Sequence, residues 1–139
     1  MKNGRYEEYG VIYWYNNDVC HREDGPAYVN AYGEKRWYVD GKLHRLDGPA
    51  IEGADGSKHW FVNGVEHRTD GPAVERTNGI KAWMFKGKEH RLDGPAIEWP
   101  DGRTKWFVDG QEVDIIAIFG KEPSIPLTNE EQMILRLAI

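Results

Sequence analysis

The sequence predicts a mainly β protein: an elongated antiparallel meander of about five 23-residue repeats, followed by a short helical cap at the C-terminal end. The first observation is a recurring heptapeptide. HRLDGPA occurs at 44–50 and again at 90–96, while HREDGPA at 21–27 and HRTDGPA at 67–73 each differ from it by one residue. The second is that glycine and tryptophan recur at the same spacing, and the third is a change of composition after the last repeat. A period of 20–50 residues is typical of repeat architectures.

The 23-residue period extends well beyond the heptapeptide. It divides residues 1–113 into units of about 4–26, 27–49, 50–72, 73–95 and 96–113, and residues at four kinds of position keep this register. They are Trp14, Trp37, Trp60, Trp83 and Trp106; His21, His44, His67 and His90; Asp24, Asp47, Asp70 and Asp93; and the glycines Gly10, Gly33, Gly56, Gly79, Gly102, Gly41, Gly64, Gly87 and Gly110. We interpret the tryptophan, histidine and aspartate series as structural residues of a repeat array.

Turn signals alternate with short strand-forming runs inside each unit. In the third unit, Asp55-Gly56 and Asn63-Gly64 separate runs such as SKHWFV. Both pairs indicate two-residue type I′ hairpin turns, because both central residues of such a turn need φ above zero. Asp70-Gly71-Pro72 indicates a third turn, since aspartate bonds nearby backbone and proline fixes φ. Each unit is therefore predicted to be a three-stranded antiparallel meander.

Two-residue turns also fix the predicted register of the strands. They place Trp60 opposite His67, and Ile51 opposite Trp60. Because side chains alternate along a strand, one face should carry tryptophan, histidine and aliphatic residues, and the other should carry charges such as Glu52 and Arg68. The heptapeptide then has structural roles throughout: histidine packs on tryptophan, arginine bridges to aspartate, and Asp-Gly-Pro reverses the chain.

Residues 114–139 are predicted to form the helical cap. The repeat breaks where Val113 stands in place of the next histidine, and the following IIAIFG predicts one or two helical turns closed by glycine. Thr128 and Glu131 have the spacing of a capping box, which predicts a last helix over about 129–138. That helix is too apolar to stay free. It should dock on the sheet, cover its last edge or bind a second chain, since repeat arrays need caps.

Composition limits the class of protein. The chain has 139 residues, of which 40% are hydrophobic and 29% charged, and no apolar run approaches the roughly 18 residues of a membrane helix. MKNGRYEEYG does not resemble a secretory signal, and the single Cys20 cannot form an internal disulfide, so a cytoplasmic location is expected. The net charge of −5 makes nucleic acid an unlikely partner.

The unit resembles the MORN repeat, in which a Gly-x-x-x-Trp strand is followed by an x-Gly turn. GSKHWFVNG (56–64) and GRTKWFVDG (102–110) carry the resemblance, which covers about residues 1–113 and is nearest to the variant of bacterial YwqK-like antitoxin components. The HRxDGPA segment departs from ordinary MORN units and is similar to repeats in proteins of tailed phages and large DNA viruses. The resemblance implies an elongated single-layer sheet and a role in protein or lipid binding, and it supplies no catalytic residue. For a viral protein the location would be the host cytoplasm.

The repeated residues do not indicate catalysis, a cofactor or a metal. Equivalent histidines are expected three strands apart, roughly 14 Å, which is too far for one ion to bridge. The adjacent Cys20 and His21 should point to opposite faces of a strand, so they cannot form a nucleophile–base pair. No P-loop, GxSxG or HExxH motif occurs. The chain is therefore expected to be non-enzymatic.

Binding to another protein is the favoured function, because tryptophan, tyrosine and arginine are the usual hot-spot residues. We expect a phage or viral accessory protein that binds and inhibits a host enzyme or defence factor. Alternatives are a protein that sequesters a nucleotide immune signal, with arginine and aromatic side chains holding phosphate and base, and the antitoxin of a toxin–antitoxin pair. The apolar last helix also permits a homodimer. The candidate exposed partner-binding residues are Arg36, Tyr38, Arg45, Phe61, Arg68, Arg91 and Phe107.

Overall fold

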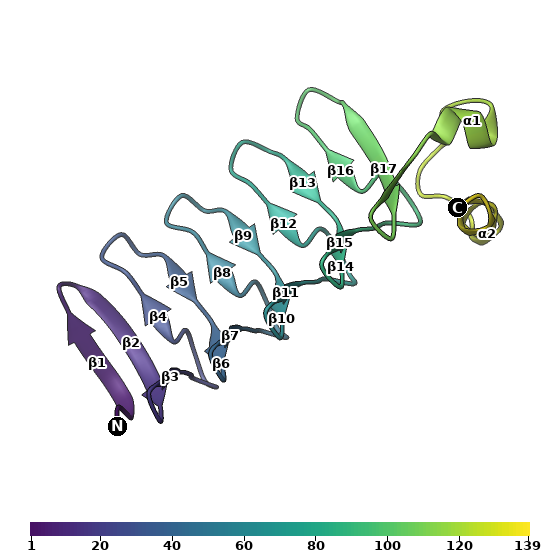
Figure 1. The fold of residues 1–139 in the computed structure, drawn as a ribbon. Coiled ribbons are helices and arrows are strands. Elements are labelled where there is room, and N and C mark those ends of the chain that lie inside the picture. Colours follow the sequence, from purple (N-terminus) through teal and green to yellow (C-terminus); the bar gives the residue numbers. More distant parts are fainter.

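A computed structural model describes all residues 1–139 and confirms the predicted fold class: a long antiparallel β array with short helices at its C-terminal end (Figure 1). Neither helix is long and apolar enough to cross a membrane. The elements are β1 (Gly4–Glu8), β2 (Val11–Asn16), β3 (Val19–Cys20), β4 (Tyr28–Val29), β5 (Lys35–Arg36), β6 (Tyr38–Val39), β7 (Lys42–Leu43), β8 (Ile51–Glu52), β9 (Lys58–His59), β10 (Phe61–Val62), β11 (Val65–Glu66), β12 (Val74–Glu75), β13 (Lys81–Ala82), β14 (Met84–Phe85), β15 (Lys88–Glu89), β16 (Ile97–Glu98), β17 (Thr104–Val108), β18 (Gln111–Val113), α1 (Ile115–Phe119) and α2 (Asn129–Leu137).

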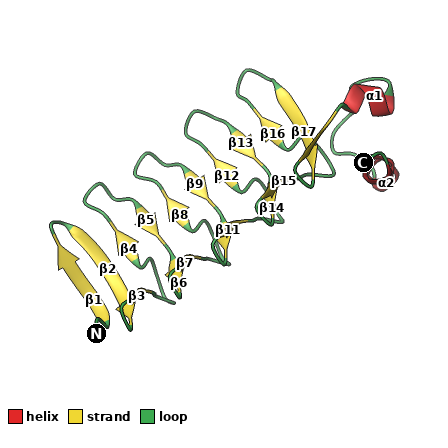
Figure 2. Cartoon of the chain, in the orientation of Figure 1, coloured by secondary structure: helices red, strands yellow, loops and turns green.

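The strands form one long sheet and three small hairpins. The main sheet has 12 strands in the order β1-β2-β4-β5-β8-β9-β12-β13-β16-β17-β18, with β3 paired to β2. The pairs β6-β7, β10-β11 and β14-β15 are separate two-stranded sheets that follow one another along the lower edge of the array (Figures 1 and 2). An interior unit therefore contributes two strands to the main sheet and one hairpin beside it.

Tryptophan is the residue at which the chain leaves the main sheet. The N–H of Trp60 donates to the carbonyl of Ala73 at 2.8 Å, in line with the main sheet, while the Trp60 carbonyl accepts from His67 N–H at 3.1 Å, in line with the hairpin. The prediction of a continuous three-stranded meander is wrong for the interior units, because the strand is divided here. Only the first and last units keep long strands through their tryptophans, as in β2 and β17.

The hairpin turns confirm half of the predicted register. Val62 pairs with Val65, and the turn residues Asn63 and Gly64 have φ values of 50° and 80°, as a type I′ turn requires. The predicted register across this hairpin also holds in the last unit, where Trp106 pairs with Val113.

The other half of the register is wrong by one residue. Ile51 pairs with His59, not Trp60, because Gly53 and Ser57 close a loop longer than the predicted two residues. Within that loop only Gly56, at φ 90°, is left-handed. A one-residue slip moves side chains to the other face of a sheet, so the predicted division into a tryptophan face and a charged face is also wrong. Only the first unit, where Arg5 pairs with Trp14, keeps the expected pairing on this side.

Alanine closes each heptapeptide and forms the interior of each repeat. The N–H of Ala50 donates to His59 and its carbonyl accepts from Trp37, both at 2.8 Å, so backbone surrounds the methyl group. The residues in this position are fully buried: Ala27, Ala50, Ala73 and Ala96. A close backbone approach of this kind leaves room for a methyl group and for little more.

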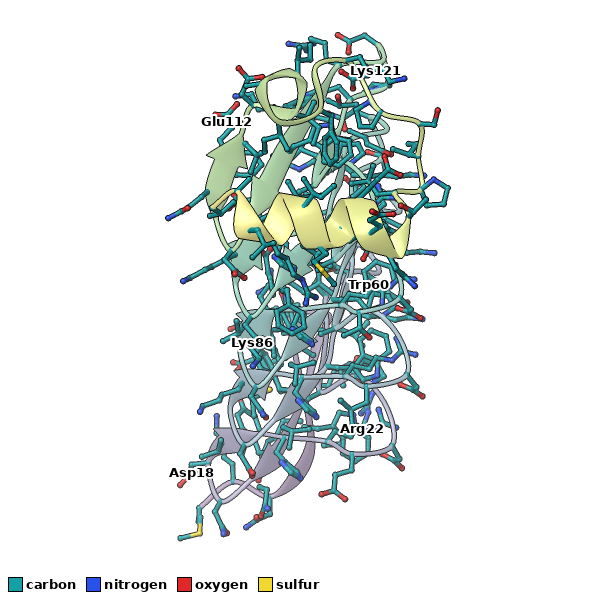
Figure 3. The ribbon with its side chains drawn as sticks, turned by 90° about the vertical axis from the view of Figure 1, so that its right-hand side faces the viewer. Asp18, Arg22, Trp60, Lys86, Glu112 and Lys121 are labelled. Atoms are coloured by element: carbon teal, nitrogen blue, oxygen red, sulfur yellow. The ribbon has the colours of Figure 1, made fainter.

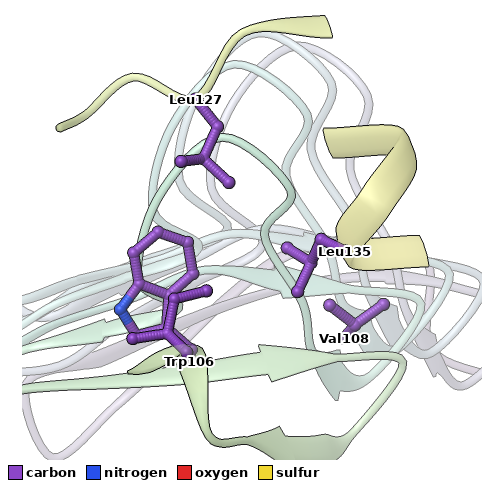
Figure 4. Close-up of a cluster of buried hydrophobic side chains, with 5 residues drawn as sticks. Trp106, Val108, Leu127 and Leu135 are labelled. Carbon is purple, nitrogen blue, oxygen red and sulfur yellow. The ribbon is translucent and has the colours of Figure 1, made fainter. Parts of the chain in front are cut away.

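The cap has the predicted helices. α1 ends at Gly120, which has φ 76°, and α2 begins with the capping box in which Thr128 and Glu131 each accept the other's backbone N–H. The cap packs on the last unit through the largest apolar cluster of the protein (Figure 4). Its buried members are Trp106, Val108, Ile115, Leu127 and Leu135.

Candidate functional site

The histidine of each heptapeptide joins one unit to the next. His44 Nδ1 accepts the backbone N–H of Asn63 at 3.0 Å, and the carbonyl of Leu43 accepts the N–H of Gly64 at 2.8 Å. We call this pair of hydrogen bonds the histidine joint. It satisfies both central N–H groups of the next type I′ turn. The other joints are His21 to Asp40, His67 to Lys86 and His90 to Asp109, all with Nδ1 to nitrogen distances of 3.0 Å.

Four joints connect the five turns of the array. At the first turn, Asn3 Oδ1 accepts the N–H of Asn17 at 2.8 Å, and the Lys2 carbonyl accepts the N–H of Asp18 at 2.9 Å. An asparagine oxygen therefore replaces the histidine nitrogen there. At the other end, Val113 occupies the position of the fifth histidine, and no further hairpin follows it. Histidine is present wherever a later turn has to be bound.

Arginine covers one face of the tryptophan ring in the first four units, where the sequence predicts histidine. The guanidinium of Arg45 lies 3.9 Å from the ring centre of Trp37. The corresponding pairs are Arg22 with Trp14, Arg68 with Trp60 and Arg91 with Trp83, at 4.2, 3.8 and 4.0 Å. Cation–π contacts of this kind are favourable when the cation is partly desolvated.

Hydrogen bonds hold the arginine in place on three sides. Arg45 Nε donates to Asp47 at 3.0 Å, and its Nη1 donates to the Pro49 carbonyl and to Glu52, both at 3.1 Å. The predicted bridge from arginine to the aspartate two residues later is confirmed. The glutamate partner differs from the predicted one, since Glu52 meets Arg45 of the preceding heptapeptide and not Arg68.

The arginines change the acidity of their aspartates. A hydrogen bond from Arg68, reinforced by its charge, lowers the pKa of Asp70, and Arg22 lowers the pKa of Asp24 in the same way. Each of these arginines binds the aspartate of its own heptapeptide. Exposed carboxylates with a depressed pKa act here as fixed charges, not as acids poised for proton transfer.

The candidate partner-binding residues are less accessible than predicted. All seven are only partly exposed, and Arg45, Arg68 and Arg91 are held by the contacts above. Arg36 is bound to Glu34 and lies 5.2 Å from the Tyr28 ring centre. The strand breaks at the interior tryptophans, so these residues do not lie on one flat sheet, and their role in partner binding stays a prediction.

The geometry around Cys20 does not suit a nucleophile. Its Sγ lies 3.7 Å from the Ala27 carbonyl, whereas the neighbouring His21 is engaged with Asp40. Burial raises the pKa of the Cys20 thiol, so the thiolate is disfavoured. Nowhere in the chain do three or more histidine, cysteine, aspartate or glutamate side chains converge in a way that could hold a metal ion. Equivalent histidines are separated by two strands of the main sheet, about 9.6 Å, not the predicted three.

Three open grooves lie between successive heptapeptides. In Figure 3, Arg22 and Trp60 mark this side of the array, opposite the turn residues Asp18 and Lys86. The residues that line groove 1 include 22–25, Trp37, Val39 and His44. Those of groove 2 include 45–48, Trp60, Val62 and His67. Those of groove 3 include 68–72, Trp83, Phe85 and His90. Their volumes are about 660, 620 and 710 Å³. This row of equivalent grooves is the candidate binding site.

The indole N–H groups in these grooves are accessible. Among the tryptophans, only Trp106 has a buried indole nitrogen without an acceptor. The groove tryptophans Trp37, Trp60 and Trp83 likewise have no acceptor within the protein, but their nitrogens reach solvent. The sequence does not predict these grooves, because they depend on the break in the strand at Trp37, Trp60 and Trp83.

Comparisons with known proteins give no relative for this chain: no protein-family model, curated protein or solved structure matches it.

Proposed function

We propose that this chain is a non-enzymatic, MORN-like repeat module that binds another protein through the side of the array carrying grooves 1 to 3. The observation that carries the proposal is the regular row of open grooves, each lined by a tryptophan, a second apolar residue and charged residues. Extended partners can bind such a row at several points at once, and tryptophan-containing pockets are frequent hot spots.

The biological role follows from the resemblance of the HRxDGPA units to phage and viral repeats. We propose that binding inhibits a host enzyme or defence factor, and that the surface is used stoichiometrically. An antitoxin that binds its toxin would use the same physical interaction. Every heptapeptide has nearly the same contacts, whereas an active site needs one asymmetric arrangement of groups.

The nucleotide-sequestering alternative is less well supported. A nucleotide trap needs arginines that are free to contact phosphate. Arg45, Arg68 and Arg91 each already bind an aspartate, a glutamate and a proline carbonyl, and each covers one face of a tryptophan ring. Phosphate would have to displace several of these contacts.

The test uses the immobilised full chain and a bacterial lysate, followed by titration of the purified captured protein. We expect one dominant protein at a fixed ratio to the chain, with binding that persists after both proteins are purified. A large rise in melting temperature with a mono- or cyclic nucleotide, without such a protein, would favour sequestration instead. Turnover of any substrate by the purified chain would contradict the proposal.

A further inference from the structure

The position that would be a fourth groove is filled by the chain itself. It lies between 91–94 and the residues Trp106 and Val108, which correspond to those that line groove 2. Leu127 and Leu135 of the cap occupy it, exposed by only 3% and 0%. In Figure 4, Leu127 points toward the Trp106 ring and Leu135 lies beside Val108.

The filling segment is also held by its backbone. Leu127 ends the proline-containing stretch 121–127, and its N–H donates to the carbonyl of Asp93 at 2.8 Å. Leu92, next to this aspartate in the heptapeptide, packs against the same cluster. The fourth heptapeptide thus binds a leucine through one carbonyl, one tryptophan and two aliphatic side chains.

Groove 2 repeats the heptapeptide and the WFV strand of this site. The heptapeptides 44–50 and 90–96 are identical, and WFV at 60–62 is repeated at 106–108. Six of the ten residues that line groove 2 are the same in the filled site. The other four belong to the next heptapeptide: His67, Arg68, Thr69 and Asp70 stand where the filled site has Val113, Asp114, Ile115 and Ile116. The walls formed by the heptapeptide and the WFV strand are the same in both sites, so they should favour the same kind of occupant, which in groove 2 also meets a more polar wall on the side of the next heptapeptide.

Two groups that the filled site uses, the backbone carbonyl of the aspartate and the leucine before it, are without a partner in groove 2. The Asp47 carbonyl accepts no hydrogen bond, unlike that of Asp93. Leu46, the counterpart of Leu92, is 80% exposed. The Asp47 side chain is 88% exposed, whereas that of Asp93 is 49% exposed. Groove 2 is therefore the filled site without its leucine.

We propose that groove 2 binds a leucine from an extended segment of the partner protein, whose leucine N–H donates to the Asp47 carbonyl. This inference rests on the proposed protein-binding function and names the chemistry of the partner. The side chain would contact Trp60, Val62 and Leu46, as Leu127 and Leu135 contact their equivalents. The imidazole of His67 adds a polar wall, and its Nε2 has no acceptor within the protein.

The repeat spacing defines the conformation of the bound segment. Equivalent grooves are two strands of the main sheet apart, about 9.6 Å. Three residues of a polyproline II helix span about 9.3 Å. A segment in this conformation, with an aliphatic residue at every third position, places consecutive side chains in grooves 1 and 2. Groove 3 is also lined by Gln132 of α2.

The experiment titrates a synthetic peptide of residues 121–139 into the isotope-labelled full chain and follows the spectrum by NMR. We expect saturable shifts of the Trp60 indole N–H and of the amides around Asp47. Leu46→Glu in the full chain should weaken peptide binding at least tenfold. Tyr32→Glu is the matched control, because Tyr32 is 85% exposed and lies outside the grooves, and it should leave the affinity unchanged. A peptide carrying Leu127→Asp should bind at least tenfold more weakly.

Three outcomes would overturn the inference: no shift at Trp60 up to millimolar peptide, equal binding to the Leu46→Glu chain, or equal binding of the Leu127→Asp peptide. Self-association of the chain that Leu46→Glu abolishes would assign the groove to a second copy and would also overturn it. The proposed function is judged separately, with the captured protein. A captured partner that binds the Leu46→Glu chain normally would support the proposed function and contradict the leucine site in groove 2. Peptide binding to groove 2 without any captured protein would support the leucine site and contradict the proposed function.

Discussion

The two ends of the array are stabilised in different ways. At the N-terminal end, all five residues of β1 are exposed, and the strand pairs with β2 on one side only. Tyrosine contacts hold it, including the edge-to-face pair Tyr6–Tyr15 with ring centres 5.6 Å apart. At the C-terminal end, α1 and α2 enclose Trp106, Val108 and Leu135 in the largest buried cluster.

The difference shows how a thin repeat protein distributes its stability. The second and third units each bury a single alanine, and the fourth buries Ala73, Val74 and Met84. Neighbouring units are therefore held chiefly by strand pairing in the main sheet and by the histidine joints. In repeat arrays, stability is approximately a sum of unit and interface contributions. We therefore expect the C-terminal end to dominate the free energy of unfolding, and each interior joint to add a small, similar amount.

The largest effect should come from Leu135→Ala, which empties the centre of the cap cluster. Loss of a fully buried leucine should lower the free energy of unfolding by roughly 2–5 kcal/mol, measured by chemical denaturation. Tyr6→Ala at the opposite end is the comparison variant and should cost only about 1 kcal/mol, because Tyr6 is exposed and loses one aromatic pair. Equal losses at the two ends would contradict the uneven distribution of stability.

Ala50→Leu should be the next most damaging change. The Ala50 methyl group is fully buried against backbone, so added carbons would cost about 1–3 kcal/mol of unfolding free energy by overpacking. Ala54→Leu in the same unit is the control; Ala54 is exposed in a loop, and the change should stay within about 0.5 kcal/mol. If Ala50→Leu lowered the free energy of unfolding no more than Ala54→Leu, the tight backbone packing around Ala50 would be contradicted.

His67→Ala should remove one joint. The Lys86 N–H would lose its acceptor, which should cost about 1 kcal/mol of unfolding free energy. His59→Ala is the matched control, since His59 lies outside the repeat register and accepts no backbone hydrogen bond; its loss should be smaller. Loss of partner binding in a His67→Ala protein of unchanged stability would instead assign the histidine a functional role.

The smallest expected effect is a pH dependence at Asp70. Arg68 lowers the pKa of Asp70 in the folded protein, so the carboxylate stabilises the fold above the unfolded pKa of about 3.9. That contribution is lost as the pH falls through the lower folded pKa. Asp70→Asn should therefore reduce stability at neutral pH, and the difference from the unchanged chain should disappear once the pH is below the folded pKa of Asp70. A difference that is independent of pH would exclude the Arg68–Asp70 interaction as its cause.

Much of the fold could be predicted because the repeat encodes it locally. The Asn63-Gly64 turn, the Thr128–Glu131 capping box and the helical stop at Gly120 depend on residues close in sequence, and all three are confirmed. The resemblance to MORN repeats stays a prediction. The predicted packing of histidine on tryptophan is replaced by a hydrogen bond from the next turn to Nδ1, and a purely structural role for histidine stays a prediction.

The rest could not be predicted because it depends on long-range geometry. Asp55-Gly56 has the same composition as a two-residue turn, yet Asp55 accepts the N–H of Ser57 and only the glycine is left-handed, which gives a longer loop. The fold of the chain at Trp60 joins two sheets through one residue, and neither composition nor periodicity reports it. The grooves follow from that fold, so the site was missed together with it.

The central claim is that the heptapeptide histidines join units through Nδ1 and perform no chemistry. The most direct measurement is NMR of the histidine ring nitrogens, with detection of coupling across the hydrogen bonds to the amides of Asp40, Asn63, Lys86 and Asp109. We predict the tautomer protonated at Nε2 for His21, His44, His67 and His90, with Nδ1 coupled to these four amides. Rings protonated at Nδ1, or four amides that exchange with solvent as freely as an unfolded chain, would contradict it.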